Sequence, residues 1–125
     1  MRNITAVYVK GNSNLFEKNV PLEFVGKRNL NLGFRNDIDI LFLEGYELLD
    51  NTYKSSLRAL GYKLYDVSKI YSEILKNFSV LKRFSDFNQK CFLRWPVINK
   101  LYSGEKIIHY DADIVFNEDP IKISA

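Results

Sequence analysis

A chain of 125 residues with 46% apolar side chains is long enough to bury a hydrophobic core as one compact domain. The formal net charge of +3 is small and the basic residues are spread along the chain, which argues against a nucleic-acid-binding protein. The single cysteine, Cys91, excludes an intrachain disulfide and favours a cytoplasmic location, and no apolar run reaches the roughly 20 residues of an integral membrane segment.

Three segments in the first part of the chain have strand-like patterns. Residues 4–9 are mostly β-branched, and a loop rich in glycine and asparagine follows them, which predicts a strand and an exposed loop. Alternating apolar side chains over residues 20–25 predict a short edge strand, because Pro21 cannot donate a hydrogen bond to a neighbouring strand. The apolar run over residues 37–43 predicts a buried strand.

Helical patterns dominate the middle of the chain. Apolar side chains recur at three- and four-residue steps over residues 46–60, and Gly61 follows, which predicts an amphipathic helix that ends at glycine. Residues 62–66 predict a short strand, and Ser68 is a candidate N-cap for the next helix. Residues 80–84 are expected to continue this helical region after a break.

The last predicted helix covers residues 87–98. Phe87, Cys91, Trp95 and Ile98 recur at four- and three-residue steps, so they are expected to line its buried face. Pro96 interrupts the pattern, because proline removes a backbone donor and clashes with the preceding turn of a helix. We therefore expect a kink, or a new helix with Pro96 in its first turn.

Residues 106–110 form the last predicted strand, which leads directly into Asp111, Ala112 and Asp113. Alternating strands and helices predict an α/β fold with a Rossmann-like, mostly parallel sheet and flanking helices, in one domain over residues 1–125. Ligands of such sheets bind beyond the carboxyl ends of the strands. Two carboxylates separated by one small residue can converge on one hard cation such as Mg²⁺ or Mn²⁺, and Ala112 leaves space for a ligand.

Residues 109–115 resemble the strand and Asp-x-Asp motif of GT-A fold glycosyltransferases, and residues 87–95 resemble the helix that precedes this motif in several such families. Arg94 lies seventeen positions before Asp111, as does the donor-facing arginine of the retaining family-8 enzymes. The resemblance implies that Arg94 contacts the donor and that Asp113 binds the metal directly. It also implies that Asp111 touches the metal or the ribose.

The loop after the first strand departs from the family-8 pattern. Lys10, Asn12 and Asn14 stand where those enzymes carry an acid-Asn-Tyr-like motif, and residues 15–16 are expected to form a short turn where a longer helix is usual. Asn12 and Asn14 remain candidates for nucleotide contacts, and Asp66, at the end of another strand, can accept from a base N–H. The candidate nucleotide-sugar contacts are Asn12, Asn14, Asp66, Arg94, Asp111 and Ala112, and the candidate metal ligands are Asp111 and Asp113.

Each candidate also has a purely structural interpretation. Two acids after a strand can be solvated turn residues. Arg94, beside Trp95, can be a snorkelling side chain or part of a buried ion pair. His109, inside a strand, is typical of a packing residue with one satisfied nitrogen.

The resemblance implies a divalent-metal-dependent glycosyltransferase that uses a nucleotide-diphosphate sugar, UDP-sugar being the commonest, in a chain truncated before the acceptor-binding half. Two alternatives stay open. The chain could be a non-catalytic nucleotide-binding fragment. Residues 111–115 also match the Asp-x-Asp-x-Val signature of haloacid dehalogenase-type phosphatases, in which Asp111 would be the nucleophile and Asp113 the acid, although only twelve residues follow Asp113.

Overall fold

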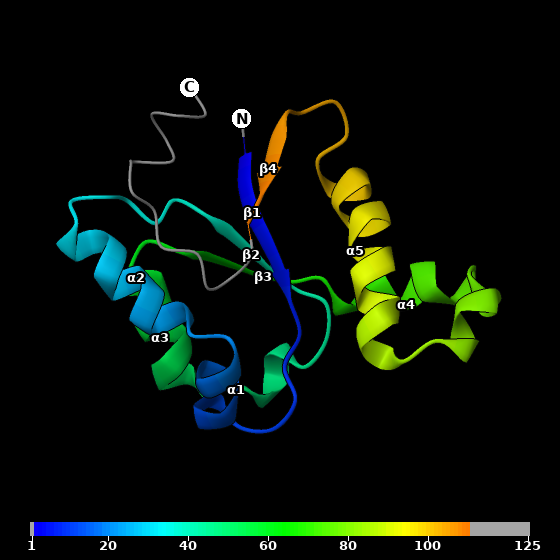
Figure 1. The fold of residues 1–125 in the computed structure, drawn as a ribbon, viewed down its shortest axis with the longest axis horizontal. Coiled ribbons are helices and arrows are strands. Elements are labelled where there is room, and N and C mark those ends of the chain that lie inside the picture. The colour runs from blue at the N-terminus through cyan, green and yellow to red at the C-terminus, as the bar shows by residue number, and fades with distance from the viewer. Residues whose placement is uncertain (1, 111–125) are drawn as a thin grey trace.

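A computed structural model describes residues 2–110, in which parallel strands form one sheet of order β3-β2-β1-β4 with helices on both faces (Figure 1). The predicted α/β fold with a Rossmann-like sheet is confirmed. The strands are β1 (Arg2–Val7), β2 (Asp39–Phe42), β3 (Lys63–Asp66) and β4 (Ile107–His109). The α-helices are α1 (Ser13–Asn19), α2 (Leu22–Asn31), α3 (Asn51–Ala59), α4 (Ser68–Lys76) and α5 (Asp86–Leu101), and the 3₁₀ helices are η1 (Tyr46–Leu48) and η2 (Ser79–Arg83).

All the strand pairs are parallel, so the strands end at one common edge of the sheet, which we call the carboxyl edge. Strand β4 pairs only with the first half of β1, from Arg2 opposite Ile107 to Ile4 opposite His109. The backbone N–H of Tyr110 then donates to the Ile4 carbonyl oxygen at 2.9 Å. Within the described range, the second half of β1 therefore has a strand neighbour only on its β2 side.

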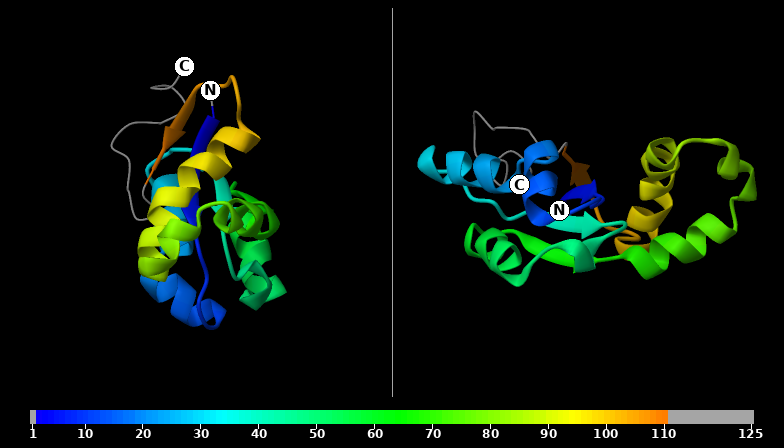
Figure 2. Two further views of the ribbon diagram at one scale, coloured as in Figure 1. Left: turned by 90° about the vertical axis from the view of Figure 1, so that its right-hand side faces the viewer. Right: turned by 90° about the horizontal axis from the view of Figure 1, so that it is seen from below.

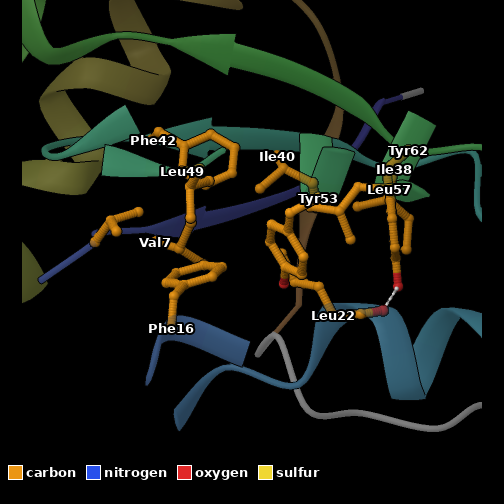
Figure 3. Packing of buried hydrophobic residues seen from close by; sticks show 11 residues of the cluster. Val7, Phe16, Leu22, Ile38, Ile40, Phe42, Leu49, Tyr53, Leu57 and Tyr62 are labelled. Atoms are coloured by element: carbon orange, nitrogen blue, oxygen red, sulfur yellow. Dashed lines mark hydrogen bonds between the residues drawn. The ribbon is translucent and has the colours of Figure 1, made fainter. Parts of the chain in front are cut away.

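Side chains of β2 alternate between two hydrophobic layers, and all four of its residues are buried. Ile40 and Phe42 pack with side chains of α1, α2 and α3, as Figure 3 shows for one layer. Leu41 belongs to the opposite layer, in which Leu93 and Val97 of α5 cover the sheet. A fully buried Leu, Ile or Phe side chain contributes about 1.5–3 kcal/mol, so these layers fix the helices on both faces of the sheet.

The edge strand predicted over residues 20–25 is wrong, because α1 ends at Asn19 and α2 begins at Leu22. The Glu17 carboxylate accepts from the backbone N–H groups of Glu23 at 2.9 Å and Phe24 at 3.2 Å, which satisfies donors in the first turn of α2. Alternation over six residues does not distinguish a strand from a short amphipathic helix, and Phe24 is exposed as one of the outward residues of that helix.

The short turn expected at residues 15–16 is also wrong, since helix α1 includes both of them. The Asn12 Oδ1 atom accepts from the backbone N–H of Leu15 at 2.9 Å and so caps this helix. Phe16 is a buried residue of α1. Its ring centroid lies 6.0 Å from that of Phe42 and 6.1 Å from that of Tyr53. One inward aromatic residue therefore holds the loop and α1 on the sheet.

The helix predicted over residues 46–60 is present as η1 followed by α3, and Asp50 caps α3 by accepting from the Tyr53 N–H at 2.8 Å. Gly61 has φ +107°, which confirms the glycine stop. The hydroxyl of Tyr62 then donates to the Leu22 carbonyl oxygen at 3.0 Å (Figure 3). This bond joins the start of β3 to the start of α2 across the core.

Ser68 is not an N-cap, because the cap position of α4 is Val67 and the Asp66 Oδ1 atom accepts from the Ser68 N–H at 3.0 Å. The predicted break before η2 and the predicted strands ending at Asp66 and Tyr110 match the observed elements to within a few residues. In the described part of the chain, no helix has both the length and the apolar character needed to cross a membrane.

Helix α5 passes through Pro96 without restarting, so the prediction of a new helix there is wrong. The predicted buried stripe is wrong for three of its four residues: Phe87 and Trp95 are exposed and Cys91 is half-buried, whereas Ile98 is buried as predicted. The side chains of α5 that face the protein interior are Lys90, Leu93, Val97 and Ile98. Two apolar stripes run along α5, and the stripe that contains Leu93 and Val97 packs against the sheet. The sequence pattern of the helix alone does not show which stripe meets the sheet.

Candidate functional site

Four charged side chains from three separate segments meet at the carboxyl edge. The Lys10 Nζ atom, in the loop after β1, lies 2.6 Å from Asp86 Oδ2 and 3.8 Å from Glu44 Oε1. The Lys90 Nζ atom, on α5, lies 2.5 Å from Asp86 Oδ1 and 2.7 Å from Glu44 Oε2. We call Lys10, Glu44, Asp86 and Lys90 the charged cluster, in which two cations balance two carboxylates.

Lys90 is the buried member of the charged cluster, with only 3% of its side chain exposed. Removing an ammonium from water is costly unless it is paired, and two carboxylates contact this one. Its Nζ atom also lies 4.8 Å from the ring centroid of Tyr8 and 5.4 Å from that of Tyr71, at distances typical of cation–π contacts. Carboxylates and aromatic faces thus replace the lost solvent.

Hydrogen bonds from Lys10 and Lys90 lower the pKa of Asp86 below its usual value. The pKa of Lys10 is raised for the matching reason, chiefly by its hydrogen bond to Asp86 and by the charge of that carboxylate. Both groups are consequently charged at neutral pH, and the Lys10–Asp86 pair is ionic.

Gly45 sets the backbone where the loops that carry Lys10 and Glu44 meet. Gly45 has φ +81°, and a Cβ atom there would lie 2.2 Å from the Val9 carbonyl oxygen, so only glycine fits. The loops after β1 and β2 touch at this point, and the Val9 N–H donates to the Glu44 carbonyl oxygen at 2.8 Å. This contact places Lys10 and Glu44 side by side in front of α5.

The hydroxyl of Tyr71 is a buried polar group next to the charged cluster. Its residue is only 4% exposed, and no hydrogen-bond partner for the hydroxyl lies among residues 2–110. Burial, together with the charges of Asp86 and Glu44, raises the pKa of Tyr71 to about 12. Leaving a buried hydroxyl without a hydrogen bond costs about 1–3 kcal/mol. A bound polar group that pairs with the Tyr71 hydroxyl would therefore be favoured.

A cavity of about 470 Å³ opens beside the second half of β1, within the volume range of small-molecule sites. Tyr8 and Lys10 line it from the end of β1, Phe16 from α1, and Phe87 from α5. Lys10 belongs both to this cavity and to the charged cluster, so an exposed cation stands at the boundary between them.

Comparison with known proteins identifies no relative. No family model, curated protein or solved structure matches this chain.

The candidate metal ligands Asp111 and Asp113, and Ala112 between them, lie outside the described residues. They follow Tyr110 directly, and β4 runs parallel to β1 toward the carboxyl edge. Within residues 2–110 no group of three His, Cys, Asp or Glu side chains could hold a metal ion.

Arg94 lies on α5 one turn beyond Lys90 and is half-buried. Its guanidinium carbon is 5.3 Å from the Trp95 ring, and its Nε atom is buried without a hydrogen-bond partner in the described part of the chain. The Trp95 ring is 5.3 Å from the ring of His109, the last residue of β4. This turn of α5 therefore lies beside the strand end that immediately precedes Asp111.

His109 fits its packing interpretation, since its Nε2 atom accepts from the Ala6 backbone N–H at 3.4 Å and its ring contacts Trp95. Arg94 also fits part of its structural interpretation, since the residue is half-buried and its guanidinium carbon lies 5.3 Å from the Trp95 ring centroid. The unpartnered Nε atom is the feature that this structural interpretation leaves without an explanation.

The remaining sequence candidates do not gather around the charged cluster. Asn12 is occupied as the cap of α1. Asn14 lines a separate hollow of about 350 Å³ between α1 and α2, and Asp66 lines another of about 470 Å³ near Tyr65 and Tyr102. Of the polar side chains considered in the first loop, the structure brings Lys10 to the carboxyl-edge cavity.

Sequence reasoning missed Glu44, Asp86, Lys90 and Tyr71. Asp86 and Lys90 stand four residues apart on one helix, a spacing that favours an ion pair and could have drawn notice to them. Glu44 precedes a glycine at the end of a buried strand, which is also a detectable signal. Their convergence depends on the order of the strands, which spacing within one segment does not give.

Proposed function

We propose that this chain is the donor-binding portion of a divalent-metal-dependent glycosyltransferase and that it binds a nucleotide-diphosphate sugar at the carboxyl edge. The observation that supports the proposal is the arrangement of β1 and β4 in the described part of the sheet. A cavity with an exposed lysine flanks the second half of β1, and the neighbouring strand β4 runs toward the same edge before Asp111 and Asp113. This arrangement suits a ligand with a diphosphate between a base and a sugar.

Asp111 and Asp113 would hold Mg²⁺ or Mn²⁺, since carboxylate oxygens are the ligands these hard cations prefer. When bound, such an ion neutralises the negative charge that develops on a departing nucleoside diphosphate. Both carboxylates of the charged cluster are already bound to lysines. We therefore assign the metal to the pair that follows β4 in the sequence, Asp111 and Asp113.

Lys10 would supply a cation to the diphosphate. Its side chain is 57% exposed, and exposed ion pairs contribute little stability, so exchanging Asp86 for a phosphate oxygen costs little. Lys90 is fixed and buried between Asp86 and Glu44, and it would position the two acids rather than contact the donor. Arg94, whose Nε atom has no hydrogen-bond partner among residues 2–110 and whose neighbour Trp95 contacts His109 of β4, would supply a second cation.

Calorimetric titration with UDP, in the presence and absence of Mn²⁺, tests this proposal. We expect binding that requires Mn²⁺, that is lost in Asp113→Ala, and that is kept in the matched control Glu118→Ala. Equal affinity in the presence of a chelator would remove the metal from the proposal. Phosphate release from a generic phosphomonoester that is abolished by Asp111→Asn would favour the phosphatase instead.

A further inference from the structure

The segment that joins α4 to α5 projects away from the sheet, at the end of the molecule opposite α2 (Figures 1 and 2). Its 3₁₀ helix η2 is held at its base, because Leu81 packs against the core layer formed by α4 and α5. The Gln89 side-chain amide of α5 also donates to the carbonyl oxygens of Leu81 at 2.9 Å and Phe84 at 3.2 Å. The projection is thus a fixed part of the fold.

Large apolar side chains on this projection point to solvent. Phe78, Val80, Phe84 and Phe92 are between 41% and 59% exposed. The rings of Phe84 and Phe92 lie 6.0 Å apart between centroids, so η2 and α5 together present one aromatic patch. Exposed apolar residues that cluster in this way typically mark a contact surface.

Three basic residues lie in the same segment as the exposed apolar side chains. Lys76, Lys82 and Arg83 are exposed, and none of them forms an ion pair with another residue of the described chain. Residues 74–85 contain these three basic side chains and no acid. Of the two acids that border this stretch, Asp86 is bound to Lys10 and Lys90, and Glu73 is exposed on α4 one turn before Lys76.

We propose that this projection, formed by Lys76, Phe78, Val80, Lys82, Arg83, Phe84 and Phe92, docks on a bilayer that contains anionic lipids. Aromatic side chains flanked by unpaired cations suit the interface between headgroups and acyl chains. None of these residues lines the hollows at the carboxyl edge or near Asn14 and Asp66, so the projection suits a lipid surface better than a peptide that needs a groove. This inference does not rest on the proposed function.

Co-sedimentation with vesicles tests the inference. We expect the whole chain to bind vesicles of phosphatidylcholine mixed with phosphatidylglycerol, and to bind pure phosphatidylcholine weakly. Phe84→Ser/Phe92→Ser and Lys82→Glu/Arg83→Glu should each reduce the bound fraction, by roughly tenfold or more, because one removes the apolar contacts and the other reverses the charge. The charge-reversal variant leaves the apolar packing intact, so it gives a result even where the serine variant unfolds.

Matched controls lie on the other side of the molecule. Phe24→Ser changes a phenylalanine of α2 that is 63% exposed, and Lys18→Glu changes an exposed lysine of α1, and both should bind vesicles like wild type. Equal loss in the controls, wild-type binding by the charge-reversal variant, or no binding to anionic vesicles at low salt would each overturn the inference. Self-association without vesicles that the serine variant abolishes would also overturn it, because a second copy would then cover the patch.

Discussion

The ammonium of Lys90 lies 2.7 Å from the Oε2 atom of Glu44, and this ion pair ties the loop after β2 to α5. Glu44 also takes part in the contact between the loops after β1 and β2, through its carbonyl oxygen and the Val9 N–H. One glutamate therefore joins three segments at the carboxyl edge. Removal of the Glu44 side chain should therefore lower the free energy of unfolding and change the position of Lys10.

Glu44→Ala should lower the free energy of unfolding by about 2 kcal/mol, because it leaves the buried ammonium of Lys90 with Asp86 as its single close carboxylate. Urea unfolding measures this change. The control is Glu47→Ala, which removes an exposed glutamate from η1 and should stay within about 0.5 kcal/mol of wild type. Similar losses in the two variants would mean that the Lys90–Glu44 pair does not hold the loops.

Acid should weaken the fold through Asp86. The pKa of this carboxyl is lowered in the folded chain by hydrogen bonds from Lys10 and Lys90, so its contribution to stability is complete above the usual pKa of 3.8. That contribution disappears as the pH falls from 3.8 through the lower, folded pKa. Urea unfolding at a series of pH values should show a smaller acid-dependent loss for Asp86→Asn than for wild type, whereas Glu47→Gln should follow wild type.

Alkali should weaken the fold through buried tyrosines. Burial raises the pKa of Tyr53, Tyr62, Tyr71 and Tyr102, and that of Tyr71 to about 12. The stability they contribute is complete below the ordinary value of 10.0 and is lost as the pH rises through each folded pKa. The free energy of unfolding should fall above pH 10, and less steeply in Tyr71→Phe.

At neutral pH, Tyr71→Phe should be neutral or stabilising, because it deletes a buried hydroxyl that has no partner in the described structure. Tyr62→Phe is the matched comparison and should cost about 1 kcal/mol, since the Tyr62 hydroxyl donates to the Leu22 carbonyl oxygen at 3.0 Å. Thermal unfolding of both variants checks the contrast. A loss in Tyr71→Phe as large as in Tyr62→Phe would show that the Tyr71 hydroxyl is satisfied.

Lys10→Ala should leave stability nearly unchanged and weaken UDP binding by about tenfold, the effect of losing one charge-assisted hydrogen bond of about 1.4 kcal/mol. The side chain is largely exposed, so its pairing with Asp86 contributes little to folding. Lys18→Ala, on the outer side of α1, is the control and should bind UDP like wild type. An unchanged affinity for UDP in Lys10→Ala would show that Lys10 does not bind the diphosphate.

The fold class follows from the order of apolar runs and helical patterns, because strands such as residues 37–43 are buried on both faces and contain few polar side chains. The sequence pattern gave a wrong prediction where a strand and a short helix share the same alternation of apolar residues. Residues 20–25 alternate as a strand would, yet the side chain of Glu17 and the buried Leu22 favour a helix there. The buried face of α5 was misassigned because Leu93 and Val97, not Phe87 and Trp95, meet the sheet.

The candidate site was only partly predictable. A site at the carboxyl edge follows from a parallel sheet, and Lys10 stands in the loop where ligand contacts were expected. The buried position of Lys90 was not visible in the sequence, because it depends on Glu44 arriving from another loop. Asn12, expected to contact nucleotide, caps α1, a role that the sequence did not reveal because asparagine suits both functions.

We propose that a nucleoside diphosphate and its metal bind at the carboxyl edge. Paramagnetic broadening by Mn²⁺ in the presence of UDP tests this proposal most directly. Strand β1 has six residues at about 3.3 Å each, so roughly 20 Å separates the two edges of the sheet. We predict that Mn²⁺ broadens the backbone amide signals of Val9, Lys10 and Glu44 but not those of Asn36 and Asp37, and that Asp113→Ala removes the effect. Broadening centred on Asn36 and Asp37, or unchanged in Asp113→Ala, would contradict the account.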